Sequence, residues 1–151
     1  MKNPKSGFTL LLAVIITGTL LVIAAGITAL AVKQSLIAVA GRDSQQAFYA
    51  ADTGLECALY WDVKNPSGFS AFDPSTGSTI YCNRDSSNPG NQWVVGGSSA
   101  STFTINFLPD LQCAVVTVTK QGLATTIESL GYNTCSAGNP RRVERAIRAR
   151  Y

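Results

Sequence analysis

The chain begins MKNPKSG (residues 1–7) and continues directly into FTLLLAVIITGTLLVIAAGITALAV (residues 8–32). The first stretch carries two lysines, whereas the second carries no charged residue, and the next charge is Lys33. Since a helix rises about 1.5 Å per residue, residues 8–32 would extend about 37 Å and could cross a bilayer core with some tilt. The sequence therefore predicts an apolar, membrane-spanning helix close to the N-terminus.

A cleavable secretory signal peptide explains this pattern less well. The apolar region of such a peptide runs for about 7–15 residues and is followed by a cleavage site with small residues. Here the apolar run is longer, and the processing-like Gly7 precedes it. Cleavage after Gly7 would remove the basic leader and keep the whole apolar helix.

The segment KSGFTL (residues 5–10) resembles the leader and first mature residues of type IV prepilins. The combination of a basic leader, Gly-Phe-Thr-Leu and an immediate apolar helix makes the motif specific. The resemblance implies that a membrane prepilin peptidase cuts between Gly7 and Phe8 and methylates the new amine of Phe8. An N-terminal anchor that is never processed is the alternative.

One position departs from the pattern of this family. Most major pilins carry Glu as the fifth mature residue, where this chain has Leu12. In the family that carboxylate meets the N-terminal amine of a neighbouring subunit. An acid in hydrocarbon is costly and is normally kept only where it serves a function. Members that lack it are mostly minor subunits of the PilX type or tip-type pseudopilins. Leu12 therefore favours a minor or initiating subunit, with a homopolymeric major pilin as the alternative.

Helical periodicity continues beyond the apolar segment. Apolar residues recur at spacings of three and four from Leu36 to Leu59, which indicates one apolar stripe. The segment QQAFYAADTGLE (residues 45–56) resembles the second half of the first helix in PilX-type subunits, and its Ala and Gly residues would let a sheet or another helix approach closely. The helix should end within residues 61–64, because Pro66 follows.

The rest of the chain has the composition of short strands and turns. Segments rich in β-branched and aromatic residues, bounded by turn residues, predict strands at 79–82, 92–95, 102–107, 113–119, 125–130 and 141–151. A turn is expected at 120–123. The expected fold class is α+β, with a long N-terminal helix whose second half packs on a small antiparallel sheet, as in the pilin fold.

This pattern divides the chain into four segments. They are a leader peptide (1–7), a transmembrane or filament-core helix (8–32), the second half of the helix (33–64) and an exported β-rich domain (65–151). Lysines before the apolar segment favour a cytoplasmic leader and an exported C-terminal domain.

The chain has four cysteines, namely Cys57, Cys82, Cys113 and Cys135. An even number in an exported domain favours disulfides, while the lack of a Cys-x-x-Cys motif and of histidine argues against a zinc site. Four cysteines allow three pairings. We prefer Cys57–Cys82 and Cys113–Cys135, because each cysteine then pairs with its nearest partner along the chain.

Composition excludes several classes of function. The chain has 0 His, which excludes histidine-based acid–base catalysis and catalytic triads. The net charge is +3 with two lysines in the leader, so the mature chain is near neutral and unlike a general polyanion binder. Asp52 and Glu56 share a helix face but suggest only a solvated surface. We therefore expect no enzyme, catalytic residue, metal or cofactor.

One local charge feature merits a functional hypothesis. The C-terminal stretch contains five arginines, namely Arg141, Arg142, Arg145, Arg148 and Arg150. They could form a solvated edge strand that discourages aggregation. They could also contact acids of a neighbouring subunit, such as Asp43, Asp52 or Glu56, or the phosphates of DNA. Aromatic residues that could stack on bases are confined to Tyr151 in this stretch.

Taken together, the resemblance implies a structural subunit of a type IV pilus or pseudopilus. Such a chain is held in the cytoplasmic membrane by one span and then passes into an extracellular pilus. The expected partners are other pilin subunits, the prepilin peptidase, an inner-membrane platform protein with its assembly ATPase, and membrane lipid before assembly. A membrane-anchored adhesin or receptor and a DNA-uptake pilin are the alternatives.

Overall fold

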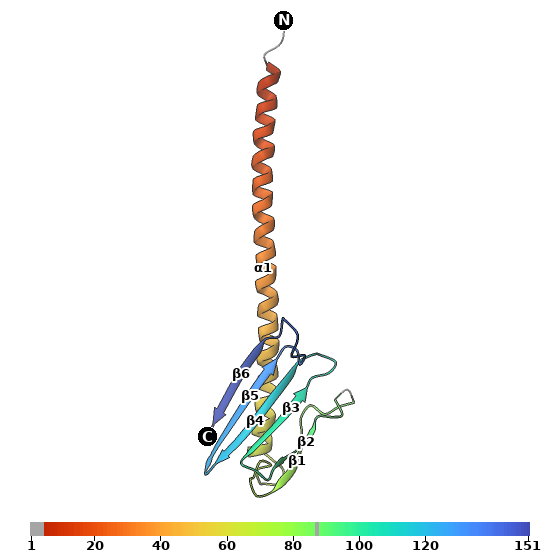
Figure 1. The fold of residues 1–151 in the computed structure, drawn as a ribbon, viewed down its shortest axis with the longest axis vertical. Coiled ribbons are helices and arrows are strands. Elements are labelled where there is room, and N and C mark those ends of the chain that lie inside the picture. Colours follow the sequence, from red (N-terminus) through yellow and green to blue (C-terminus); the bar gives the residue numbers. More distant parts are fainter. Residues whose placement is uncertain (1–4, 87) are drawn as a thin grey trace. The chain divides into compact units, whose positions relative to one another are not determined.

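The computed structural model describes residues 5–86 and 88–151, so residues 1–4 of the expected leader lie outside it. The chain forms two units, which divide after Ala40 and are described separately below. The described residues form one helix and six strands: α1 (Lys5–Val63), β1 (Gly77–Tyr81), β2 (Gln92–Gly96), β3 (Ala100–Asn106), β4 (Cys113–Gln121), β5 (Ala124–Tyr132) and β6 (Glu144–Arg150) (Figure 1). The α+β class is the one that the sequence predicted.

The helix ends where the sequence predicted that it would. Val63 is its last residue, and the amide of Lys64 still donates to the carbonyl of Tyr60 at 2.8 Å. The side chain of Asn65 then accepts a hydrogen bond from the Ser67 amide across Pro66. An asparagine that bonds the backbone two residues on favours a turn, so the Asn-Pro pair closes the helix.

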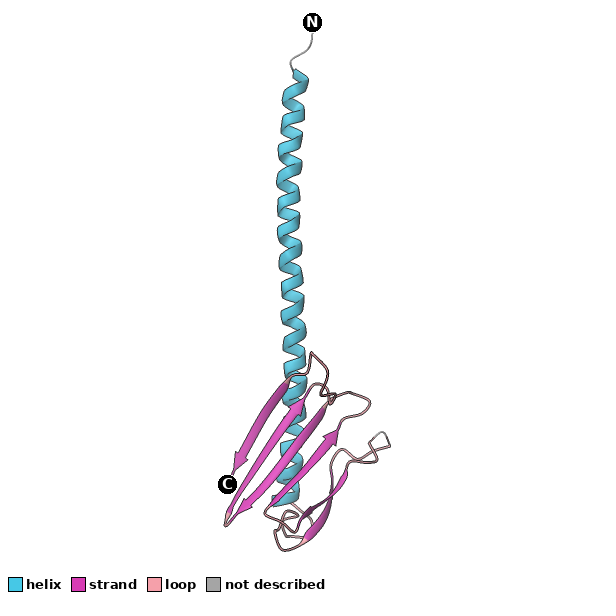
Figure 2. Cartoon of the chain, viewed as in Figure 1, coloured by secondary structure: helices cyan, strands magenta, loops and turns pink. Residues whose placement is uncertain are grey.

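The main sheet has four antiparallel strands in the order β3-β4-β5-β6 (Figure 2). A two-residue turn at Gly122 and Leu123 joins β4 to β5, with Gln121 opposite Ala124. Gly122 has φ of 60°, a conformation that suits glycine and the tight turns of hairpins. The predicted turn was therefore too long, since Lys120 and Gln121 belong to β4.

The prediction of a single sheet was wrong. Strands β1 and β2 pair with each other in a separate two-stranded sheet. Gly96 and Gly97 follow one another with φ of 80° and 68°. This positive-φ pair cannot continue an extended strand, so the chain leaves β2 before it enters β3.

The prediction of the last strand was right in type and too long at its start. Strand β6 begins at Glu144, whereas Arg141 and Arg142 lie in a turn held by Asn139. Asn139 accepts hydrogen bonds from both amides, at 2.9 Å through its side chain and at 3.0 Å through its carbonyl. An asparagine that bonds nearby amides in this way favours a turn over a strand.

Within the second unit, α1 packs against one face of the main sheet through small residues. A Cβ atom on Gly131 of β5 would lie 2.1 Å from the carbonyl oxygen of Ala47, and one on Gly54 would lie 2.8 Å from Val116. The expectation that alanine and glycine allow a close approach to a sheet is therefore confirmed. The largest fully buried apolar side chains of this core are Phe72, Ile80, Ile105, Val116, Val118 and Ile127.

Candidate functional site

The described part of the N-terminal unit is a helix whose large apolar side chains are exposed. The most apolar stretch of this helix has no buried residue. Phe8, Leu21 and Val22 are each more than two-thirds exposed. By length and composition, the described helix is able to cross a membrane.

The hydroxyl groups in this apolar segment find acceptors inside the helix itself. Thr17 donates to the carbonyl of Ala13 at 2.9 Å, and Thr28 donates to that of Ala24 at 2.6 Å. Thr19 donates in the same way one turn back. Because these three hydroxyls are satisfied locally, lipid or apolar helices can surround them without a loss of hydrogen bonds.

The surface around Leu12 is a shallow apolar trough. Phe8, Leu12 and Ile16 follow one another at spacings of four residues on one side of the helix and line it together with Ala13. The apolar side chain of Leu12 cannot form a charge pair, and Thr9 and Thr17 are the polar residues that line the trough beside it. The Gly7–Phe8 bond lies within α1, and a Cβ on Gly7 would meet nothing within 4 Å.

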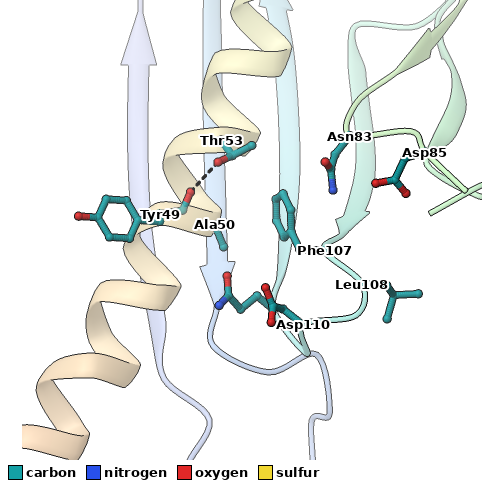
Figure 3. Close-up of a pocket in the computed structure, with 9 residues that line it drawn as sticks. Tyr49, Ala50, Thr53, Asn83, Asp85, Phe107, Leu108 and Asp110 are labelled. Atoms are coloured by element: carbon teal, nitrogen blue, oxygen red, sulfur yellow. Dashed lines mark hydrogen bonds between the residues drawn. The ribbon is translucent and has the colours of Figure 1, made fainter. Parts of the chain in front are cut away.

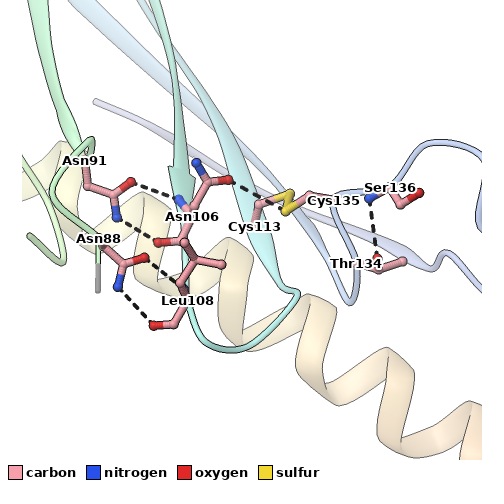
Figure 4. Close-up of a disulfide and its surroundings, with 8 residues drawn as sticks. All are labelled: Asn88, Asn91, Asn106, Leu108, Cys113, Thr134, Cys135 and Ser136. Carbon is pink, nitrogen blue, oxygen red and sulfur yellow. Dashed lines mark hydrogen bonds between the residues drawn. A yellow bond between two sulfur atoms is a disulfide. The ribbon is translucent and has the colours of Figure 1, made fainter. Parts of the chain in front are cut away.

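In the second unit, the two disulfides hold the irregular segments in place. Cys57 of α1 pairs with Cys82 at the end of β1, with a Cα–Cα distance of 6.1 Å. Cys113 at the start of β4 pairs with Cys135, at 5.5 Å, beyond the end of β5 (Figure 4). These are the two pairs that we preferred from the order of the cysteines.

Two asparagine side chains extend the edge of β3. Asn91 exchanges two hydrogen bonds with the backbone of Asn106, and Asn88 exchanges two with the backbone of Leu108 (Figure 4). Both asparagines are almost fully buried. Buried amides need such partners, so these bonds hold the loop between β1 and β2 against the main sheet.

A buried carboxylate connects the end of the helix to the sheet. The side chain of Asp62 is only 3% exposed and pairs with Lys120 of β4 at 2.5 Å. It also accepts hydrogen bonds from the hydroxyls of Ser70 and Tyr151. Burial acts to raise the pKa of Asp62, but the hydrogen bonds from Lys120, Ser70 and Tyr151 outweigh it, so the pKa lies below its usual value.

The five arginines do not act as one cluster. Arg142 lies over the ring of Tyr132, 3.8 Å from its centroid, and Arg145 donates to the hydroxyl of Ser44 on α1 at 2.9 Å. Arg148 lies opposite Glu128 on the outer face of the sheet. Arg141, Arg145, Arg148 and Arg150 are therefore exposed charges, whereas Arg142 is half-buried against Tyr132.

A polar groove runs between α1 and the loops that follow β1 and β3 (Figure 3). Asp85 and Asp110 come from the two loops, and Tyr49 and Thr53 from the helix. Within residues 5–86 and 88–151, no three His, Cys, Asp or Glu side chains come together in a way that could hold a metal ion. The groove therefore provides no metal centre among the described residues.

The chain matches no family model, and it has no significant match to a curated protein or to a solved structure. The structure nevertheless shows a pilin-like arrangement, namely a long apolar N-terminal helix and an antiparallel sheet with disulfides.

Sequence reasoning missed the residues that organise the second unit. Asp62, Lys120 and Tyr151 are far apart in the chain, and no periodicity links them. Asn88 and Asn91 lie in a segment that reads as a polar surface connection, although both are buried. The only available signal was that both asparagines flank a Pro-Gly turn between two strands.

Proposed function

We propose that this protein is a structural subunit of a type IV pilus or pseudopilus, of the minor or initiating PilX-type class. The observation that carries the proposal is the uncharged, exposed helix surface of residues 8–32, directly behind the prepilin-like KSGFTL motif. In this proposal the peptidase cleaves between Gly7 and Phe8 and methylates Phe8.

The physical basis of assembly is the apolar surface itself. An uncharged helix of this length cannot remain in water, so it needs either lipid or other apolar helices around it. The membrane provides the first environment and the core of a helical filament provides the second. The same residues 8–32 therefore serve as anchor before assembly and as packing surface afterwards.

The minor-subunit assignment is supported by Leu12. The trough around it offers no carboxylate to a neighbouring N-terminal amine. Incorporation then depends on the fit of Phe8, Leu12 and Ile16 against other pilin subunits. The chain itself is not an enzyme in this proposal, and the assembly ATPase and platform protein supply the work of extraction.

Mass spectrometry of the N-terminus tests the proposal. Protein from cells with an active prepilin peptidase should begin with N-methylated Phe8, whereas protein from cells without the peptidase should keep residues 1–7. A Gly7→Val variant provides the matched control, because a bulky residue at the cleavage site should leave the leader attached. Intact wild-type leader in the presence of active peptidase would overturn the pilin assignment in favour of a permanent membrane anchor.

A further inference from the structure

A second groove, lined in part by the Cys57–Cys82 disulfide, combines aromatic rings with a carboxylate. It has a volume of about 360 Å³ and lies between α1 and the end of β1. Tyr60 and Trp61 of the helix and Tyr81 of the strand line it, and Glu56 supplies its only carboxylate. None of these four residues takes part in the assembly surface proposed above.

The three rings stand at steep angles to one another. The rings of Tyr60 and Trp61 are 5.6 Å apart at 87°, and those of Trp61 and Tyr81 are 5.1 Å apart at 74°. Tyr60 and Tyr81 are about half exposed, whereas Trp61 is 9% exposed. The rings therefore form a corner, in which a cation can meet more than one ring, and not the flat platform on which a sugar ring stacks.

This corner is already rigid without a ligand. The disulfide between Cys57 and Cys82 joins the two elements that carry the rings. The indole N–H of Trp61 donates to the carbonyl of Tyr81 at 3.0 Å, which fixes the orientation of the indole. A site whose walls are held in place loses little conformational entropy when it binds.

The carboxylate of Glu56 has no salt-bridge partner among the residues that the structure describes. Glu56 forms no salt bridge there, since Asp62 and Lys120 make up the ion pair found among those residues. The basic residues nearest to the groove in the sequence, Lys64 and Arg84, do not line it. A carboxylate beside aromatic faces attracts a cation through both its charge and the ring quadrupoles.

We infer that this groove, defined by Glu56, Tyr60, Trp61 and Tyr81, binds an arginine side chain of a partner polypeptide. A planar guanidinium can pair with a carboxylate and stack on an aromatic face at the same time, which an ammonium group does less well. Because the groove is open, a free small cation would keep much of its surface in water. A partner chain provides the flanking contacts that such an open site needs. The inference does not depend on leader cleavage or on fibre assembly.

The two tryptophans of the chain allow a direct test. The full-length chain, labelled with ¹⁵N in a polyoxyethylene detergent that carries neither charge nor sugar, is titrated with acetyl-Gly-Arg-Gly-amide. The indole resonance of Trp61 should shift saturably, while that of Trp93, which packs on Phe103 in the core, should not. The same peptide with citrulline in place of arginine has nearly the same shape without the charge and should have no effect.

Matched variants then assign the binding to the groove. Glu56→Gln and Tyr60→Leu should each weaken binding by about two- to fivefold, as expected for a half-exposed ion pair or cation–π contact. Tyr49→Leu is the control, since Tyr49 is an exposed tyrosine of the same helix that does not line this groove.

Three results would overturn the inference. They are the absence of a saturable Trp61 shift with the arginine peptide, an equal response to the citrulline peptide, and a Trp61 shift with methyl β-glucoside in place of the arginine peptide. The last result would identify a sugar subsite. None of these results bears on processing at Gly7, so the failure of this inference and that of the proposed function are distinguishable.

Discussion

The side-chain amide of Asn91 pairs with the backbone of Asn106 in both directions, as the peptide group of a neighbouring strand would. Its nitrogen donates to the Asn106 carbonyl at 2.7 Å, and its oxygen accepts from the Asn106 amide at 3.1 Å. The Asn91 nitrogen also donates to the carbonyl of Asn83 at 3.2 Å. One buried side chain thus provides hydrogen-bond partners for both backbone groups of the last residue of β3 and also bonds the loop after β1.

Replacement of Asn91 should therefore lower stability more than a surface change would. Asn91→Ala removes the buried side chain that bonds the amide and the carbonyl of Asn106. Because both backbone groups then lack these partners, we expect a loss of about 2–3 kcal/mol in the free energy of unfolding. Denaturant titration of the full chain in detergent measures this loss. Gln92→Ala, next in the chain and exposed, is the control and should stay within about 0.5 kcal/mol of wild type. Equal stability of the two variants would show that the pairing contributes nothing.

Gly131 lies so close to the helix that an added Cβ atom would clash with helix backbone. Gly131→Ala would place a methyl group 2.1 Å from the carbonyl oxygen of Ala47. Because the backbone of a packed helix cannot move aside without cost, we expect the free energy of unfolding to fall by about 3 kcal/mol. Gly41→Ala is the matched control, because a Cβ there meets nothing within 4 Å. On an open helix surface it should stabilise by up to about 1 kcal/mol. Thermal unfolding of both variants should give melting temperatures on opposite sides of wild type.

The pKa of Asp62 predicts how stability responds to acid. The folded-state pKa lies below the ordinary value of 3.8, so the unfolded chain binds the proton more tightly. The contribution of Asp62 is therefore present above that ordinary value and is lost as the pH falls through the folded pKa. Asp62→Asn should lower the melting temperature at pH 7 and flatten its fall in acid. Asp110→Asn, on an exposed loop, should leave the profile unchanged, and identical profiles for both variants would refute the role of Asp62.

The two disulfides should contribute similar amounts of stability. Their cysteines are separated by 25 and 22 residues, and loops of that size correspond to about 3 kcal/mol each in the chain-entropy account. The double variants Cys57→Ala/Cys82→Ala and Cys113→Ala/Cys135→Ala should each show such a loss in denaturant titration. Non-reducing peptide mapping of protein from the cell surface provides the control. A different connectivity would refute the pairing, and four free thiols would refute the bridges themselves.

The apolar side chain of Leu12 predicts tolerance at this position. Leu12→Ala keeps the trough apolar and should change incorporation into fibres only slightly, whereas Leu12→Glu would add the carboxylate typical of major pilins. Quantitative blotting of purified fibres measures both variants together with wild type. If the wild-type chain dominates the fibres, the minor-subunit assignment is wrong and a homopolymer takes its place.

The sequence by itself determined the helix and the strands, but it left three disulfide pairings possible, and the structure shows the one that we preferred. Residues 8–32 lack charge, Pro66 follows the helix, and β-branched segments alternate with turns, so each of these elements is encoded in neighbouring residues. The small residues at 47, 51 and 54 also indicated a close approach, because their size is visible without any partner.

Only the tertiary structure decided which distant groups meet. Asp62, Lys120 and Tyr151 lie up to 89 positions apart, and their meeting depends on the register of β4 and on the end of β6. The division of the sheet after Gly96, the separate roles of Arg142 and Arg145, and the aromatic corner beside Glu56 have the same origin. Local propensity acts over a few residues, whereas burial and hydrogen bonding select contacts across the whole domain, and no pattern along the chain records that selection.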